Sequence, residues 1–536
     1  MRYKLIENLR LGFNDAENYK HRKNKDLFNR VFVKSEELDL LLEETTYFLV
    51  GDKGTGKTAY AVFLSNSEYK NYQSSLKYIR ETDYRKFVSL KQKKQLELSD
   101  YQSIWKVILY LLISKQIIQN EPKGFLEKIY SRKLNILNSA IDQYYSNAFN
   151  PEILYALNIM EETSFAAELI AAKKASFSGE SKVGTSFSES RFQMNLFYIE
   201  KQFEEALSAL KLEKSHTIFI DGIDIRPSNI EYHEYLECIK GLANALWTIN
   251  SDFFSNIKDS PGRLKVVMLL RPDIFESIGL QNTNNKIADN SVLLDLRTSY
   301  NVYRDSVLFN IVDNLLSKQQ DSNLTRGEAW DHYFPYKLNL KGSPDDSFIG
   351  FLRYGMSRPR DIISAMDIMK AEYASTNRIK LGVFTEDDFE SREFKNKYSE
   401  YLLGEIKDQL SFYYALSDYE TFLKFFEFLY GRYKFGYNSY LISFNEYIEH
   451  IESSNVSKPD FAETADGFLQ FLYNLNVIGF IDKVDGKDWH RWCYRQRSYS
   501  NISPKIKTHT EYTIHYGLGK ALNIGKVIDR TKNSRK

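Results

Sequence analysis

The stretch Gly51-Asp52-Lys53-Gly54-Thr55-Gly56-Lys57-Thr58 matches the pattern G-x-x-x-x-G-K-[ST] at every position. It follows the apolar run 47–50 and precedes the largely apolar segment 59–64, which predicts a strand, a loop and a helix in that order. Glycines let successive backbone N–H groups turn inward around phosphate oxygens, and the following helix directs the positive end of its dipole at them. The stretch therefore predicts a P-loop α/β fold, a parallel sheet with helices on both faces, that binds a nucleoside triphosphate such as ATP.

The residues of this loop have separate expected roles. All of them, from Gly51 to Thr58, are expected to contact the bound nucleotide. Lys57 is expected to reach the β- and γ-phosphates and to act in catalysis. Thr58 is expected to bind Mg²⁺ through its hydroxyl, because this hard cation takes few protein ligands and keeps most of its waters. ATP and Mg²⁺ are the predicted cofactors.

A phosphate loop of this kind requires a carboxylate on a second strand, and the run 217–221 supplies one. Four residues of strand character end in Asp221, which is expected to orient a Mg²⁺-bound water as a metal-binding and catalytic residue. Asp224 follows three residues later and is expected to position or deprotonate the attacking water. The alternative interpretation of Asp224 is a loop acid or a helix N-cap.

A further apolar strand, 264–270, ends in Arg271-Pro272, so a cation is expected at the same edge of the sheet as the two acids. Arg271 is a candidate catalytic residue that reads the γ-phosphate, and Pro272 stops the strand. The alternative is that Arg271 pairs with a nearby surface acid.

The residues at the ends of these two strands, Asp221-Gly222-Ile223-Asp224 and Arg271-Pro272, resemble those of the STAND class of P-loop NTPases. This class is related to NACHT and AAA+ proteins. Segments along most of the chain together resemble an uncharacterised group of bacterial STAND-like ATPases, and these segments are 11–17, 51–58, 269–274, 357–361 and 398–402. The resemblance implies an ATP-driven switch in signalling or antiphage defence. We expect the chain to form a homo-oligomer and, because no second catalytic constellation is apparent in the sequence, to work with a separate effector protein. Gly222 follows Asp221 where AAA+ enzymes have a glutamate that activates water, so we expect ATP hydrolysis to be slow.

The resemblance also implies a helical lid, which we place at residues 301–380. Within it, Pro359 suits the first turn of a helix. Arg358 and Arg360 beside it are expected to contact the nucleotide and to couple the γ-phosphate to the angle between lid and core. The alternative is an arginine pair that caps neighbouring helices.

The ATPase core is expected to span residues 1–300 with a largely helical insertion at about 85–210, because the distance between the two motifs far exceeds one crossover. A further strand is predicted at 76–79, and a loop rich in serine and glycine at 176–186. Apolar residues at helical spacing predict three helices, at 101–118, 153–172 and 194–210.

Residues 381–536 are predicted to form a C-terminal winged-helix-like domain. Thr385 is expected to cap a helix, and helices are expected at 419–430 and 468–474. They precede a hairpin whose strands are placed at 477–481 and 491–495, with the turn around Asp485-Gly486. From residue 487 to the end, twelve Lys or Arg residues stand against three acids and are interleaved with aromatic residues. Such a region indicates DNA or RNA binding, or alternatively a solvated surface or a contact with an acidic partner.

The composition limits the remaining classes. Lys and Arg total 72 and Asp and Glu total 71, so the nearly neutral chain has no strong overall electrostatic field that would indicate nucleic acid or a membrane as its partner. Two widely separated cysteines favour a reducing compartment, and no run is long and apolar enough for a membrane span. We therefore expect a cytoplasmic protein of three or four domains.

Two other functions fit parts of the pattern. The first is an ATP-dependent loader of DNA of the origin-recognition AAA+ type, in which the basic C-terminal region makes the DNA contacts. The second is a P-loop kinase, although no acceptor-binding motif is apparent in the sequence.

Overall fold

The computed structural model describes residues 3–78, 98–120, 135–142, 189–226, 230–280, 282–339, 344–375, 382–454 and 456–525. The chain forms two compact units, each of which has most of its residue contacts within itself. The sheet unit comprises Glu36–Gly51 and Lys57–Leu293, and the terminal unit comprises Met1–Ser35, Asp52–Gly56 and Leu294–Lys536. The chain thus passes from one unit to the other and back within the predicted phosphate loop.

Five parallel strands form the centre of the sheet unit, in the order β2-β3-β4-β1-β5. The strands are β1 (Phe48–Val50), β2 (Tyr72–Tyr78), β3 (Ser215–Asp221), β4 (Leu264–Leu270) and β5 (Ser291–Leu293). Every residue of β1 and β4 is buried, as is typical of parallel strands covered on both faces. The predicted parallel sheet is confirmed, and the strands predicted at 217–221 and 264–270 are present.

The register of the sheet brings the ends of three strands to one edge. Val50 is level with Leu270, and Ile220 is level with Met268. Because all strands run in the same direction, Gly51, Asp221 and Arg271 leave the sheet at its carboxyl edge, as predicted. β4 lies between β1 and β3. Arg271, which follows β4, is therefore one strand away from the end of β1, and Asp221, at the end of β3, is two strands away.

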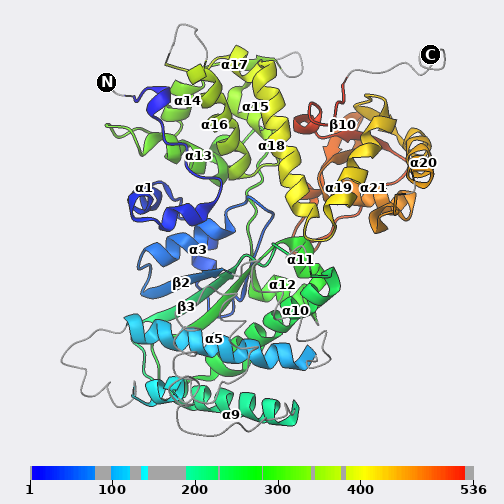
Figure 1. The fold of residues 1–536 in the computed structure, drawn as a ribbon. Coiled ribbons are helices and arrows are strands. Elements are labelled where there is room, and N and C mark those ends of the chain that lie inside the picture. The colour runs from blue at the N-terminus through cyan, green and yellow to red at the C-terminus, as the bar shows by residue number, and fades with distance from the viewer. Residues whose placement is uncertain are drawn as a thin grey trace, which may run out of the picture. The chain divides into compact units, whose positions relative to one another are not determined.

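Helices cover both faces of this sheet (Figure 1). α3 follows β1 and packs against β2, while α5 and α10 lie on the other face and α9 packs outside α5. The helices of the unit are α2 (Glu36–Leu40), α3 (Lys57–Asn66), α5 (Leu98–Asn120), α9 (Glu189–Ser208), α10 (Tyr232–Thr248), α11 (Pro272–Ile278) and α12 (Thr283–Asn290).

The helices predicted at 101–118 and 194–210 correspond to α5 and α9. α5 is buried almost all round, because β3, α10 and α9 all pack against it. The helix predicted at 153–172 and the loop predicted at 176–186 lie outside the described residues.

The terminal unit contains a group of helices preceded by short N-terminal elements. Its helices up to residue 410 are α1 (Arg22–Val31), α13 (Val307–Ser317), α14 (Glu328–Tyr333), α15 (Ser347–Tyr354), α16 (Pro359–Ser375), α17 (Glu386–Glu390) and α18 (Arg392–Leu410), with a small hairpin of β6 (Lys337–Asn339) and β7 (Pro344–Asp346). As predicted, Pro359 is the first residue of its helix, and Thr385 caps α17 through a reciprocal capping box with Asp388. The N-terminal segment contacts α16, where the Ser364 hydroxyl donates to Asn14 Oδ1 at 2.8 Å.

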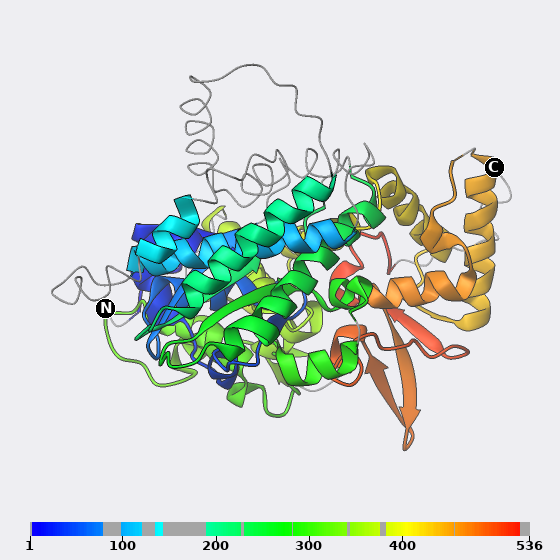
Figure 2. The same ribbon diagram turned by 90° about the horizontal axis from the view of Figure 1, so that it is seen from below.

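The last part of the terminal unit combines helices with a four-stranded antiparallel sheet of order β10-β9-β11-β8. Its elements are α19 (Leu416–Lys424), β8 (Lys434–Gly436), α20 (Tyr437–Ser453), α21 (Ala465–Asn474), β9 (Ile478–Val484), β10 (Lys487–Arg491), α22 (Cys493–Gln496) and β11 (Glu511–Ile514). Figure 2 shows the β9–β10 hairpin projecting from this sheet.

The hairpin was predicted with its turn at Asp485-Gly486, which is correct, but its second strand was placed too late. β10 ends at Arg491, whereas residues 493–496 form the short helix α22. The run 491–495 is apolar enough for a strand, but its Trp492, Cys493 and Tyr494 are buried instead as the start of a helical turn.

Among the described helices of the chain, none combines the length and the apolar run that crossing a bilayer requires.

One charged residue is buried in the middle of the parallel sheet. Lys265 of β4 is 4% exposed, and its ammonium donates to the carbonyl oxygens of Leu41 at 2.8 Å and Glu43 at 2.6 Å. Burial lowers the pKa of Lys265 to about 7. This side chain therefore ties the segment before β1 to the sheet at the expense of desolvating a charge.

Lys265 predicts a pH dependence of stability. In the unfolded chain lysine titrates near a pKa of about 10.4. Between about pH 7 and 10 the unfolded chain thus binds more protons than the folded one, and the free energy of unfolding rises with pH, by at most about 1.4 kcal/mol per pH unit. We expect thermal unfolding measured from pH 7 to 9 to show this rise, and Lys265→Met to reduce its slope. The exposed Lys211→Met is the control, and equal slopes in both variants would contradict the assignment.

Candidate functional site

The predicted phosphate loop joins β1 to α3. Gly51 continues the sheet by donating its N–H to Leu270 O at 3.1 Å, and α3 begins at Lys57. Gly54 and Gly56 have φ angles of +87° and +105°, which residues with a side chain rarely adopt. Gly54 and Gly56 are therefore required by the backbone conformation of the loop.

The sheet unit brings the loop's last two residues against the acid of β3. Thr58 Oγ1 donates to Asp221 Oδ2 at 2.6 Å, across 163 positions of sequence. Lys57 is 8% exposed, and its ammonium donates to Gly51 O at 2.8 Å. The hydroxyl, the carboxylate and the ammonium predicted to act together thus lie at one edge of the sheet.

The Asp221 carboxyl is buried and has an unusual protonation equilibrium. Burial, followed by the nearby charge of Asp224, raises its pKa to about 6. The Thr58 hydroxyl, the Lys57 ammonium and the Gly222 N–H, which donates to Asp221 Oδ1 at 2.8 Å, act in the opposite direction. A carboxylate in this environment gains most from a cation that compensates its charge.

The turn that carries Asp224 is held by a residue that the sequence did not indicate. Tyr235, in the first turn of α10, donates its hydroxyl to Ile223 O at 3.0 Å and, more weakly, to Ile225 O at 3.3 Å. Both carbonyls flank Asp224, whose side chain is partly exposed. Tyr235 therefore fixes the backbone on either side of the predicted water-positioning acid.

Arg271 is buried at 2% exposure and is engaged by a neighbour on its own chain segment. Its Nε donates to Asp273 Oδ1 at 3.1 Å and its Nη2 to Asp273 Oδ2 at 2.8 Å. The bidentate pair spans the start of α11, where Pro272 is the first helical residue. The predicted pairing with an acid is thus present, and the γ-phosphate contact stays a prediction.

The terminal unit contacts the other half of the loop. Arg358 is 7% exposed and donates through Nη1 to Lys53 O at 2.9 Å. Its remaining nitrogens form a bidentate pair with the fully buried Asp361, at 2.8 and 2.6 Å. Arg360 lies along the loop as well, and its Nη1 donates to Glu405 Oε2 at 3.3 Å.

The side chains of Asp52 and Lys53 are also bound within this unit. Lys53 Nζ lies 2.6 Å from Asp408 Oδ2 and 3.6 Å from Glu405 Oε1, both on α18. The Asp52 carboxylate accepts from the guanidinium of Arg497, which follows α22. Asp361 has a local signal, since it stands three positions after Arg358 on a helix, but Glu405, Asp408 and Arg497 are distant in sequence and had none.

The residues predicted to hold Mg²⁺ fit that ion chemically. Thr58 and Asp221 present a hydroxyl and a carboxylate oxygen side by side, and hard oxygen donors in small number suit a cation that keeps several waters. The buried position of Asp221 with a raised pKa supports the same assignment. Thr58 and Asp221 would hold the ion, which would compensate the charge of bound phosphates.

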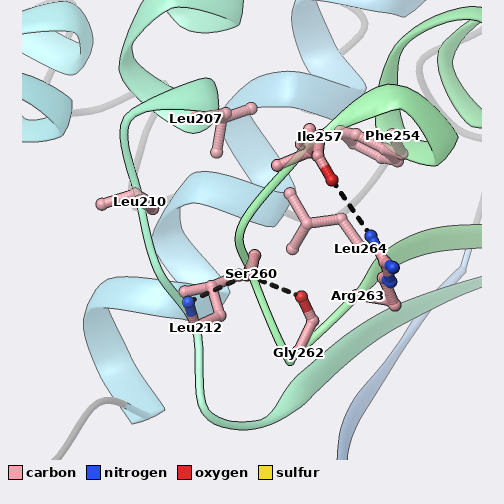
Figure 3. A pocket seen from close by; sticks show the side chains of 9 residues that line it. All are labelled: Leu207, Leu210, Leu212, Phe254, Ile257, Ser260, Gly262, Arg263 and Leu264. Carbon is pink, nitrogen blue, oxygen red and sulfur yellow. Dashed lines mark hydrogen bonds between the residues drawn. The ribbon is translucent and has the colours of Figure 1, made fainter.

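A small crevice at the opposite end of the sheet does not belong to this site. Figure 3 shows its mainly apolar lining, which includes the first residue of β4, Leu264. The Ser260 hydroxyl there donates to Gly262 O at 2.8 Å and accepts from Leu212 N at 3.0 Å. Its polar groups thus stabilise backbone turns.

No protein-family model matches the chain, and no curated protein is significantly similar to it. The fold class, an α/β protein with a five-stranded parallel sheet, rests on the strand order and register. What this sheet edge does chemically is argued from its own residues.

The loop geometry predicts different costs for two glycine substitutions in the terminal unit. A β-carbon at Gly54 would lie 3.2 Å from Arg360 Cβ in addition to the strained φ, whereas Gly486 has φ +73° and no heavy atom within 4 Å of such a carbon. Gly486→Ala should cost about 1 kcal/mol from backbone strain alone. We expect Gly54→Ala to lower the unfolding temperature of this unit further, and equal decreases would contradict the packing of Arg360 on the loop.

Proposed function

We propose that this chain is an ATPase of the P-loop class that works as an ATP-dependent molecular switch with slow turnover. The observation that carries the proposal is the 2.6 Å hydrogen bond between Thr58 and Asp221. It joins the last residue of the glycine-rich loop to the acid of β3, at the carboxyl edge where open parallel sheets bind ligands. Two residues from separate motifs, both predicted to bind Mg²⁺, are therefore neighbours in the structure.

In this proposal each residue has a distinct role. The loop binds the phosphates of ATP, and the Lys57 ammonium compensates charge on the β- and γ-phosphates. Mg²⁺ bound by Thr58 and Asp221 supplies further charge stabilisation at the transferring phosphoryl group. Asp224 orients the attacking water from the turn that Tyr235 holds. Arg271, Arg358 and Arg360 respond to the γ-phosphate.

The wider proposal is a STAND-like switch in signalling or antiphage defence. In it, residues 301–380 act as lid and residues 381–536 as a winged-helix-like domain. The chain would act in the cytoplasm as a homo-oligomer with a separate effector protein. Slow hydrolysis suits such a role, because a switch must remain in its ATP-bound state long enough to signal.

The first test is ATP binding and hydrolysis by the purified chain and its variants. We expect Lys57→Ala to weaken MgATP binding at least about tenfold, because a charge-assisted contact to phosphate is lost. Asp224→Asn should retain binding while turnover falls about 100-fold, as loss of a group that orients or deprotonates water predicts. Calorimetric titration and single-turnover phosphate release measure the two effects.

The control for this test is Lys211→Ala, which changes an exposed lysine on the segment leading to the amino end of β3. Undiminished hydrolysis in Lys57→Ala would overturn the proposal. Transfer of the phosphoryl group to an added acceptor, with no free phosphate, would instead support the kinase alternative.

The DNA-loader alternative receives less support from the C-terminal residues. α21, which precedes the β9–β10 hairpin and would be the helix that enters a groove, contains no Lys or Arg and includes Asp466. Two arginines of the basic segment are engaged within the protein, since Arg497 is 8% exposed and the guanidinium of the half-buried Arg495 packs over the rings of Tyr300 and Tyr494.

We accordingly expect ATP turnover to be indifferent to nucleic acid. Turnover measured with and without double- and single-stranded DNA at low salt should agree within twofold, and ATP should change the mass measured by light scattering. DNA-stimulated turnover that declines steeply with added salt would favour the loader.

A further inference from the structure

The second and third residues of the predicted phosphate loop carry opposite charges, and both are bound by the terminal unit. The Asp52 carboxylate pairs with Arg497, and the Lys53 ammonium pairs with Asp408 at 2.6 Å. The motif leaves both positions free, so their charges are not needed for the loop to fold around phosphate. Their use as ion-pairing residues is a property of this chain.

These pairs belong to a group of charged residues around the loop, in which the Asp52–Arg497 pair adjoins the others only through the backbone between residues 52 and 53. Arg358 holds the carbonyl of Lys53 and the carboxylate of Asp361, while Glu405 is shared by Lys53 and Arg360. The members are Asp52, Lys53, Arg358, Arg360, Asp361, Glu405, Asp408 and Arg497. A network in which carboxylates and cations alternate contributes more to positioning than isolated surface pairs do.

Arg497 is the member that comes from furthest along the chain. Its side chain is 9% exposed, and its backbone N–H donates to Cys493 O at 3.2 Å, which closes the end of α22. α22 in turn is joined to the loop before β9, because Asn476 Oδ1 accepts from Tyr494 N at 2.8 Å. A shift of the Arg497 guanidinium therefore involves the end of the four-stranded sheet as well as Asp52.

We infer that Arg497 is a positioning residue that, through Asp52, holds the phosphate loop in its binding shape and links occupancy of the loop to the C-terminal residues. The inference rests on the proposed function. Gly54 and Gly56 make the loop backbone flexible, so ordering it before the nucleotide arrives reduces the entropic cost of binding. Because coupling between two sites is reciprocal, a bound nucleotide must strengthen the Arg497 contact by the same factor.

The coupling has a direction that an experiment can read. The ion pair and the bound nucleotide both favour the same loop conformation, so breaking the pair weakens nucleotide binding. In the reverse direction, nucleotide protects the segment around Arg497 from amide hydrogen exchange. If the pair only stabilised the fold, breaking it would lower the unfolding temperature and leave both of these quantities unchanged.

The test is a double-mutant cycle on Asp52 and Arg497, read by calorimetric MgATP binding at 50 and 300 mM NaCl. Asp52→Asn and Arg497→Gln should each weaken binding about fivefold at low salt, the effect of one partly buried ion pair. The double variant should be no weaker than either single variant. The charge-exchanged variant, Asp52→Arg with Arg497→Asp, should recover most of the affinity.

Three further measurements keep the result unambiguous. Lys505→Gln, an exposed lysine in the same part of the chain, is the control and should bind as the wild type does. Addition of MgATP should slow amide hydrogen exchange over residues 493–498 in the wild type. In Asp52→Asn, the exchange rates of these residues should be the same with and without MgATP. Asp52→Asn also guards against a folding defect in Arg497→Gln, since the side chain of Asp52 is 27% exposed on a loop.

The outcomes separate the two proposals. If the wild type binds no MgATP, the proposed function fails. If the wild type binds MgATP and Asp52→Asn binds it equally well, or if the effects of the two single variants add, the role of Arg497 is refuted while the proposed function stands.

Discussion

The parallel pairing of β1, β4 and β3 is the constraint on which the candidate site depends. Backbone hydrogen bonds fix Val50 beside Leu270 and Ile220 beside Met268, so the residues that follow each strand emerge at the same edge. A slip of one residue in β3 would turn Asp221 to the opposite face of the sheet. Every residue of β1 and β4 is buried, because helices cover both faces of the sheet.

Burial makes this edge chemically different from an ordinary surface. Asp221 is withdrawn from water and lies near a second carboxylate, which leaves it short of positive charge in the absence of a ligand. The loop that follows β1 contains two glycines with positive φ angles, and Arg358 and Arg360 contact it. A buried carboxylate that favours a nearby cation and a glycine-rich backbone thus occur together at the segment that we propose binds nucleotide.

Local patterns predicted the parts of the molecule that local chemistry determines. The glycine-rich loop, the strands before Asp221 and Arg271, the helix starts at Pro359 and Thr385 and the turn at Asp485 were all apparent in the sequence. The second hairpin strand was misplaced because buried aromatic residues satisfy a strand pattern and a helical turn equally well. Glu405, Asp408 and Arg497 contact the loop across long separations, whereas Tyr235 contacts the turn of Asp224 from the next helix, and no spacing rule connects any of them to the motif. The grouping of residues 52–56 with the terminal unit likewise depends on contacts between distant parts of the chain, which a single sequence does not display.

The hydroxyl of Tyr235 has a consequence for how the helical insertion relates to catalysis. Tyr235 belongs to α10, which packs along α5, the first described helix of the insertion. Because Tyr235 donates to the carbonyls on both sides of Asp224, a displacement of α10 by α5 would reach the turn that carries Asp224. In the proposed ATPase, a partner that displaced α5 would change how fast water attacks the nucleotide and would leave the affinity for the nucleotide unchanged.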